Sequence, residues 1–170
     1  MALPRTSDIL GNLAQSIRSN LTEDTVLVGI HTGGAWVAEE LHRLLGLSTP
    51  LGMLDISFYR DDFEQIGLHP EVKPSDIPFD VDGADILLVD DVLYTGRTVR
   101  AAINELFDYG RPARIRLAVL VDRGGRELPI EPTFSGFHLD FDRQIDLLRN
   151  ENGELELRLR GHAKTDQQER

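Results

Sequence analysis

Three short segments rich in valine, leucine and isoleucine, each followed by a polar turn that contains glycine, constrain the fold of this chain most strongly. The segments are Val26–Ile30, Ile86–Val89 and Ile115–Val121, and their turns lie at 31–34, 90–98 and 122–126. Near-continuous apolar runs of this length are typical of strands that are buried on both faces of a parallel sheet. Because amphipathic helices are predicted between them, we expect an α/β fold with a central, mostly parallel sheet flanked by helices.

Apolar residues recur at helical spacing in three further segments, at 8–20, 37–45 and 99–107. Ser7 is the expected N-cap of the first helix, and Gly46 and Gly110 stand where the second and third helices should end. Right-handed crossovers would then place the three turns at the carboxyl ends of the strands. Ligands of open α/β sheets bind at these ends.

Two regions depart from this alternation of strands and helices. A strand is expected to contain residues 54–59, but the segment 60–83 carries acids, prolines and little periodicity. A long segment of this kind inside a domain is often a lid, so we expect a lid loop at about 60–83. Leucines alternate with charged residues at 154–159, after the turn signal Asn152-Gly153, which predicts an antiparallel hairpin with 145–149.

The composition narrows the class of protein. A chain of 170 residues has the usual length of one domain, so we expect a single domain spanning 1–170. The absence of cysteine excludes disulfides, thiolate catalysis and cysteine-ligated zinc. With neither a signal peptide nor an apolar run of roughly 20 residues, we expect a soluble cytoplasmic protein that does not act at a membrane. The net charge of −11 argues against nonspecific nucleic-acid binding.

The turn at 90–98 carries the strongest functional signal. Asp90 and Asp91 follow the apolar strand, and Tyr94-Thr95-Gly96-Arg97-Thr98 opens the next helix. Gly96 allows a ligand to approach the backbone, and the N–H groups and dipole of a helix start favour a phosphate. Carboxylates can accept hydrogen bonds from the hydroxyls of a ribose beside that phosphate. The structural alternative is that Thr98 caps the helix and the two acids are solvated.

This run resembles the phosphoribosyl-pyrophosphate motif of type I phosphoribosyltransferases. The longer segment 86–130 is similar to the pyrimidine operon regulatory proteins that have uracil phosphoribosyltransferase activity, and the likeness extends from about 27 to 130. The matching segments are Val89–Arg100, Gly110–Pro112, Val121–Ile130 and Asp55–Asp62. The resemblance implies the type I phosphoribosyltransferase fold in a single domain, with a small hood at about 122–137.

The resemblance also implies an activity. It indicates a glycosyltransferase, a uracil phosphoribosyltransferase that makes UMP and pyrophosphate from uracil and 5-phosphoribosyl-1-pyrophosphate. It implies Mg²⁺ as the cofactor, bound mainly through the substrate and close to Asp90 and Asp91 rather than by protein ligands alone. Homodimers or larger homo-oligomers are implied as well.

Individual residues take roles from the same resemblance. Asp90 and Asp91 would hold the ribose hydroxyls, and Arg60, at the root of the lid, would reach the pyrophosphate. The residues expected around the 5′-phosphate are Tyr94, Thr95, Gly96, Arg97 and Thr98. The residues expected at the pyrophosphate are Thr32, Gly33 and Gly34. The substrate-binding residues expected in the hood over the base are Asp122 and Arg123.

Three positions distinguish this chain from other members. Gly33 stands where the pyrophosphate loop usually carries arginine, so one cation for the leaving group is missing. Gly125 stands where the hood usually carries histidine. Tyr94 stands where purine-using relatives carry aspartate, and because an ordinary tyrosine has a pKa of about 10, we assign it a positioning role rather than that of a base.

A transcriptional regulator is the alternative function. Such a protein would sense UMP or phosphoribosyl pyrophosphate with weak or no catalysis, and would act through leader RNA or a protein partner. Gram-positive members of the family bind RNA on a basic dimer face that includes the N-terminal helix. Here that region offers only Arg5 and Arg18, with Asp8, Glu23 and Asp24 nearby, and aromatic residues make up 6% of the chain. RNA recognition needs cations and stacking side chains, so the sequence favours the enzyme.

Overall fold

In the part of the chain that the structure describes, five strands form the central sheet in the spatial order β2-β1-β3-β4-β5, and every neighbouring pair is parallel. The computed structural model describes residues 2–56, 75–139 and 143–160. The strands of this sheet are β1 (Val26–Ile30), β2 (Gly52–Leu54), β3 (Asp85–Leu93), β4 (Arg114–Asp122) and β5 (Phe134–His138). The three apolar runs of the sequence lie in β1, β3 and β4, so the prediction of a parallel sheet is confirmed.

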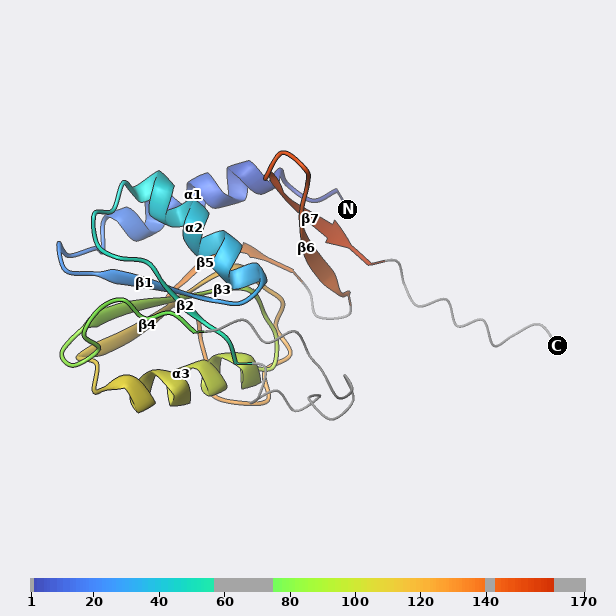
Figure 1. Ribbon diagram of the computed structural model, residues 1–170. Helices are drawn as coiled ribbons and strands as arrows, with labels where there is room; N and C mark the ends of the chain where they lie inside the picture. The colour runs from blue at the N-terminus through green and yellow to red at the C-terminus, as the bar shows by residue number, and fades with distance from the viewer. Residues whose placement is uncertain (1, 57–74, 140–142, 161–170) are drawn as a thin grey trace.

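Among the described residues, three helices cover the two faces of the sheet. They are α1 (Thr6–Arg18), α2 (Gly33–Leu45) and α3 (Arg97–Tyr109). In Figure 1, α1 and α2 lie on one face and α3 lies on the other. Side chains alternate along a strand, so Leu87 and Val89 of β3 pack with α1 and α2, whereas Ile86 and Leu88 pack with α3. The core therefore has two layers, one on each side of the sheet.

A second, two-stranded sheet lies beside α1, as Figure 1 shows. It consists of β6 (Ile145–Arg149) and β7 (Leu155–Leu159), which pair antiparallel with Leu147 opposite Leu157. Both of these leucines are buried in the layer formed by α1 and α2. The hairpin predicted from the alternating leucines is therefore confirmed.

The start of α1 differs from the prediction. The helix begins at Thr6, with Arg5 at the N-cap position and no side-chain cap, so Ser7 is not the N-cap. The buried hydroxyl of Thr6 accepts a hydrogen bond from the backbone N–H of Leu157, at 2.9 Å. The partner lies 151 residues away in the sequence, so a local capping rule could not anticipate this contact.

One strand was placed incorrectly from the sequence, and another was not predicted. The strand expected at 54–59 begins at Gly52 and ends at Leu54, and residues 57–59 lie outside the described residues. The last residues of the hood expected at 122–137 belong to β5, which pairs with β4. β5 has no long apolar run because glycine stands at position 136, where a side chain would not fit. A Cβ on Gly136 would stand 2.6 Å from Ile9 of α1 and 2.8 Å from the carbonyl oxygen of Leu120.

The described part of the expected lid packs against the rest of the protein. Asp76 exchanges two backbone hydrogen bonds with Met53, both at 2.8 Å. Val81 is buried, and Ile77 and Phe79 pack on the layer that contains α3. Residues 75–83 are thus anchored to the sheet, and the remainder of the expected lid, 60–74, lies outside the described residues.

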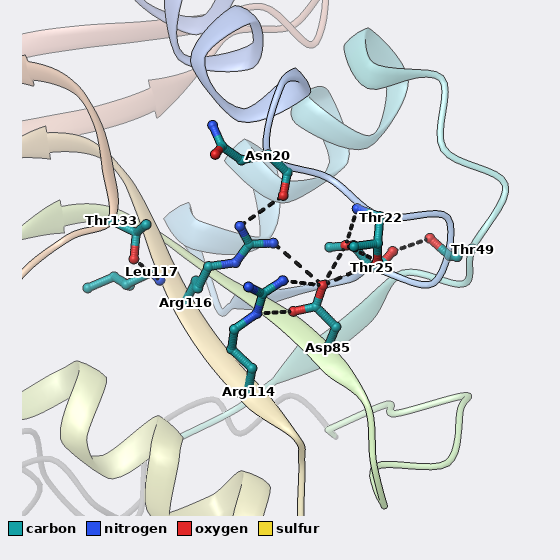
Figure 2. A network of polar contacts seen from close by, with 9 residues as sticks. All are labelled: Asn20, Thr22, Thr25, Thr49, Asp85, Arg114, Arg116, Leu117 and Thr133. Carbon is teal, nitrogen blue, oxygen red and sulfur yellow. Dashed lines mark hydrogen bonds and ion pairs between the residues drawn. The ribbon is translucent and has the colours of Figure 1, made fainter.

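A cluster of polar side chains ties the amino ends of β3 and β4 to the segments around them (Figure 2). Asp85, the first residue of β3, accepts hydrogen bonds from Thr25 Oγ1 at 2.8 Å and from Arg114 Nε and Nη2, both at 2.9 Å. Arg116 Nη2 lies 3.5 Å from the same carboxylate, and its Nη1 donates to the carbonyl oxygen of Asn20 at 2.9 Å. The hydrogen bond from Arg114 is the main cause that lowers the pKa of Asp85, against the effect of burial. This cluster stabilises the sheet at the edge opposite the three turns.

Candidate active site

Three loops meet at the carboxyl edge of the sheet because β1, β3 and β4 are neighbours that run in the same direction. The loop after β1 leads into α2 at Gly33, and the loop after β3 leads into α3 at Arg97. The loop after β4 begins at Arg123 and returns to the sheet as β5. The carboxyl edge therefore brings together two helix N-termini and the segment expected to form the hood.

Residues Tyr94, Thr95 and Gly96 form the turn between β3 and α3, called here the phosphate loop. Gly96 is the N-cap residue of α3 and has a φ of +93°, a conformation that favours glycine. The Thr95 hydroxyl accepts a hydrogen bond from the backbone N–H of Arg97 at 3.2 Å. Since Gly96 occupies the N-cap position, the alternative in which Thr98 caps this helix is wrong.

A pocket of about 140 Å³ opens at this turn. Its lining residues are Asp90, Val92, Leu93, Tyr94, Thr95, Gly96, Thr98 and Val99. The volume is several times the roughly 30 Å³ that a water molecule occupies in the liquid, so a small anion fits there. The first N–H groups of a helix are free of intrahelical partners, which favours a negatively charged group at such a place.

Asp90 and Asp91 lie within β3 rather than in a loop beyond it, and both carboxylates face the start of α2. Asp90 is buried, and its Oδ1 accepts a hydrogen bond from the N–H of Asp91 at 2.9 Å. Asp91 Oδ1 accepts from the N–H of Val92 at 2.8 Å. A Cβ added to Gly34 would stand 3.0 Å from Asp90 Oδ1, and one added to Gly33 would stand 2.0 Å from Asp91 Oδ2.

The turn formed by Thr32, Gly33 and Gly34, called here the pyrophosphate loop, touches β3 through its glycines. The peptide bond between His31 and Thr32 is cis. A Cβ on Gly34 would stand 2.7 Å from the carbonyl oxygen of Val89, so only glycine allows the helix start to approach the strand this closely. The space beside Gly33 holds the carboxylate of Asp91, a flexible group that a side chain at this position would have to displace.

In the hood, Asp122 and Arg123 lie at and just beyond the end of β4. Asp122 Oδ1 accepts hydrogen bonds from the N–H of Gly124 at 3.0 Å and from Arg126 Nη2 at 2.8 Å. The guanidinium of Arg123 stacks on the ring of Tyr94, 4.0 Å from the ring centre. Gly125 lies under the same ring, where a Cβ would stand 2.3 Å from Tyr94 Cε2, and its φ of +74° is a conformation that favours glycine.

Two arginines at this edge are not among the residues that line the pocket. Arg97 turns toward the hood, where its Nε lies 3.4 Å from Glu127 Oε1, and it does not line the pocket. The side chain of Arg126 is largely buried among the loops. It contacts the carbonyl oxygen of Tyr94 at 3.0 Å. The sequence held no signal that distinguishes Arg126 from Arg123.

Ser75 connects the segment after β2 to α3 through hydrogen bonds. Ser75 accepts a hydrogen bond from the N–H of Asp55 at 2.9 Å and donates one to Glu105 Oε1 at 2.7 Å. Burial is the main cause that raises the pKa of Glu105, and the charges of Asp55 and Asp108 raise it further, whereas the Ser75 hydroxyl lowers it. Arg60, the one predicted catalytic residue of the lid, lies outside the described residues.

A larger groove of about 730 Å³ lies elsewhere, between the start of α1, the end of α2 and the hairpin. None of the site residues predicted from the sequence lines it. Within the described ranges 2–56, 75–139 and 143–160, no group of three or more His, Asp or Glu side chains could hold a metal ion. No helix in those ranges is long and apolar enough to cross a membrane.

Comparisons with known proteins agree on one family. The model of the phosphoribosyl transferase domain matches residues 2–146. The bifunctional protein PyrR of Pseudomonas aeruginosa is 55% identical over 147 residues, which cover 84% of this chain and 86% of that protein. The bifunctional protein PyrR of Nitrosococcus oceani is 57% identical over 135 residues, 76% of each chain.

Solved structures show the same architecture. The purine phosphoribosyltransferase of Pyrococcus horikoshii is 27% identical with a TM-score of 0.59, over 78% of this chain and 82% of that one. A hypoxanthine-guanine phosphoribosyltransferase of Bacillus anthracis has a TM-score of 0.65 at 18% identity, over 82% of this chain and 79% of that one. At that identity, the second similarity shows the fold alone.

Proposed function

Because the chain belongs to the phosphoribosyltransferase family, and within it to the bifunctional PyrR proteins, we propose that it transfers a phosphoribosyl group from 5-phosphoribosyl-1-pyrophosphate to uracil. The products are UMP and pyrophosphate. One observation carries most of the proposal: the 140 Å³ pocket at the N-terminus of α3, which Thr95, Gly96 and Thr98 line beside the buried Asp90. A helix N-terminus favours the 5′-phosphate, and a carboxylate next to it can accept hydrogen bonds from the ribose hydroxyls.

Each loop takes one part of the donor in this proposal. Tyr94, Thr95, Gly96 and Thr98 bind the 5′-phosphate, while Asp90 and Asp91 bind the ribose hydroxyls. Thr32, Gly33 and Gly34 present the N-terminus of α2 to the pyrophosphate. The close contact between Gly34 and β3 supports this assignment, since it fixes the helix start beside Asp90.

Displacement of pyrophosphate from the anomeric carbon should pass through an oxocarbenium-like state, as glycoside cleavage does. The protein then has to position both reactants and exclude water that would hydrolyse the donor. We assign water exclusion to the lid at 60–83, with Arg60 at the pyrophosphate. Residues from 122 to 133 form the hood over the uracil, where Asp122 and Arg123 contribute to base binding.

The residues at this edge fit a role for Mg²⁺. The ion prefers oxygen ligands and usually keeps waters and substrate oxygens, so it needs few protein ligands. Asp91 Oδ2 faces the pyrophosphate loop, and Asp90 Oδ1 lies next to Gly34, so both carboxylates border the place proposed for the leaving group. When bound, Mg²⁺ would neutralise charge that develops on the pyrophosphate.

A steady-state assay tests the function. The protein is mixed with phosphoribosyl pyrophosphate, Mg²⁺ and one base, and both the nucleotide and pyrophosphate are followed. We expect turnover with uracil, and none with hypoxanthine, xanthine or orotate. Turnover with a purine base alone would contradict the proposed base, and release of pyrophosphate without nucleotide would indicate a hydrolase.

A regulatory role is the second candidate, because the relatives are named bifunctional. In this alternative the same site senses UMP or phosphoribosyl pyrophosphate and the protein acts on transcription through leader RNA or a protein partner. We also propose a homodimer or a larger homo-oligomer. Tight binding of UMP without turnover on any base would favour the sensor over the enzyme.

A further inference from the structure

The guanidinium of Arg126 joins the hood to the phosphate loop. Its Nη1 donates to the carbonyl oxygen of Tyr94 at 3.0 Å, and its Nε donates to the carbonyl oxygen of Ile130 at 2.7 Å. Its Nη2 donates to Asp122 Oδ1 at 2.8 Å. The side chain is 17% exposed, so these contacts form in a largely dry environment. One residue therefore holds three segments of the site in fixed relative positions.

Backbone contacts reinforce this junction. The carbonyl oxygen of Thr95 accepts hydrogen bonds from the N–H groups of Glu127 at 2.9 Å and of Leu128 at 3.1 Å. A Cβ on Gly96 would stand 3.0 Å from Ile130 Cβ, so the hood lies directly on the phosphate loop. The carbonyl groups of Tyr94 and Thr95 thus both point toward the hood.

The direction of these carbonyls fixes the direction of the neighbouring N–H groups. In a trans peptide the C=O and the N–H point to opposite sides of the chain, and the peptides after Tyr94 and Thr95 are trans. With their carbonyls turned to the hood, the N–H groups of Thr95 and Gly96 point away from it. The pocket lies on that side, since the phosphate loop lines it and no residue of the hood does.

We propose that Arg126 is a positioning residue that orients the N–H groups of Thr95 and Gly96 for the 5′-phosphate, an inference that rests on the proposed function. Arg126 acts through the backbone rather than on the ligand, because carboxylates already neutralise its charge. Asp122 lies 2.8 Å from its guanidinium and Glu131 lies 3.7 Å from it. Lysine cannot replace it, because a single ammonium group lacks the planar fork that reaches several acceptors at once.

The test compares the affinity of the protein for UMP with its affinity for uridine, which lacks only the phosphate. We expect the wild-type protein to bind UMP far more tightly than uridine. In Arg126→Gln, the ratio of the two affinities should fall by about 10- to 100-fold, because hydrogen bonds to a charged group are lost. A general loss of structure would weaken both ligands alike and leave the ratio unchanged. Arg111→Gln, which removes an exposed arginine outside the site, is the matched control and should leave the ratio unchanged.

The outcomes separate this proposal from the proposed function. If the wild-type protein binds UMP and uridine equally, the phosphate site itself is wrong. If the wild-type ratio is high and Arg126→Gln retains it, the role of Arg126 is refuted while the site stands. Should Arg126→Gln fail to fold, Arg126→Lys decides the question: a reduced ratio supports the proposal, and the wild-type ratio overturns it.

Discussion

Replacing Asp85 by alanine should destabilise the protein without affecting its active site. Asp85 lies at the amino end of β3, whereas the proposed site lies at the carboxyl end (Figures 1 and 2). The substitution removes the acceptor of hydrogen bonds from Thr25 and Arg114, and it removes the carboxylate that lies 3.5 Å from Arg116. We therefore expect a loss in the free energy of unfolding.

The magnitude follows from the exposure of the partners. The side chain of Arg114 is 48% exposed, so solvent screens its ion pair with Asp85 and the share of that pair should be small. Asp85 and Arg116 are only 15% and 13% exposed, and breaking a fully buried pair costs about 3–5 kcal/mol. The contact between those two is long, at 3.5 Å, so its share should lie below that range. Together these contributions predict a loss of about 2–4 kcal/mol for Asp85→Ala.

The loss should also depend on pH. The hydrogen bond from Arg114 lowers the pKa of Asp85 in the folded protein, and an unfolded aspartate has a pKa of about 3.9. A carboxylate whose folded pKa is depressed contributes fully above the unfolded pKa, and its contribution disappears as the pH falls through the folded value. The difference in stability between wild type and Asp85→Ala should therefore be constant at neutral pH and shrink below about pH 4.

Urea unfolding of wild type, Asp85→Ala and Arg114→Met, at neutral and at acidic pH, measures these quantities. Arg114→Met is the control for the exposed pair and should cost much less than Asp85→Ala. Turnover of folded Asp85→Ala should equal that of wild type. A loss well below 1 kcal/mol at neutral pH, or a loss that is undiminished in acid, would refute the reasoning about this cluster.

Three further predictions concern the carboxyl edge. Gly34→Ala should lower the free energy of unfolding by about 1–3 kcal/mol and impair turnover, because the new Cβ would stand 2.7 Å from the carbonyl oxygen of Val89. Wild-type stability of this variant in urea unfolding would contradict the prediction. Gly33→Arg should tighten pyrophosphate binding in calorimetric titrations, because it adds a cation and only the flexible carboxylate of Asp91, 2.0 Å from the new Cβ, has to turn aside; unchanged or weaker binding would show that the carboxylate holds its place. Asp90→Asn combined with Asp91→Asn should reduce turnover at least about 100-fold while circular dichroism stays unchanged, and retained activity would remove both residues from the site.

The sheet was predictable because its central strands are buried on both faces, which leaves an unambiguous apolar run in the sequence. β5 escaped detection for the opposite reason. It lies at the edge of the sheet, and Gly136 makes room for α1 instead of contributing an apolar side chain. The start of α1 was also misplaced. The helix begins at Thr6, whose hydroxyl accepts a hydrogen bond from Leu157 of the distant hairpin, and Ser7 does not act as the cap.

At the site, the turns themselves could be predicted from the sequence, since glycine at a strand end permits a positive φ and threonine can hydrogen-bond to the backbone of a turn. Contacts between different turns were not visible. The carboxylate of Asp91 fills the space beside Gly33, and the ring of Tyr94 covers Gly125. Arg126 reaches the backbone of Tyr94 from 32 residues away. Such contacts depend on how loops from different strands come together, and the spacing of residues along one segment does not encode them.

A crystal structure of the protein with UMP bound tests the central claim most directly, because it locates the phosphate without depending on turnover. The account predicts the 5′-phosphate in the pocket lined by Thr95, Gly96 and Thr98, the ribose hydroxyls at Asp90 and Asp91, and the base toward the hood. Density for the nucleotide elsewhere, such as in the 730 Å³ groove beside the hairpin, would contradict it.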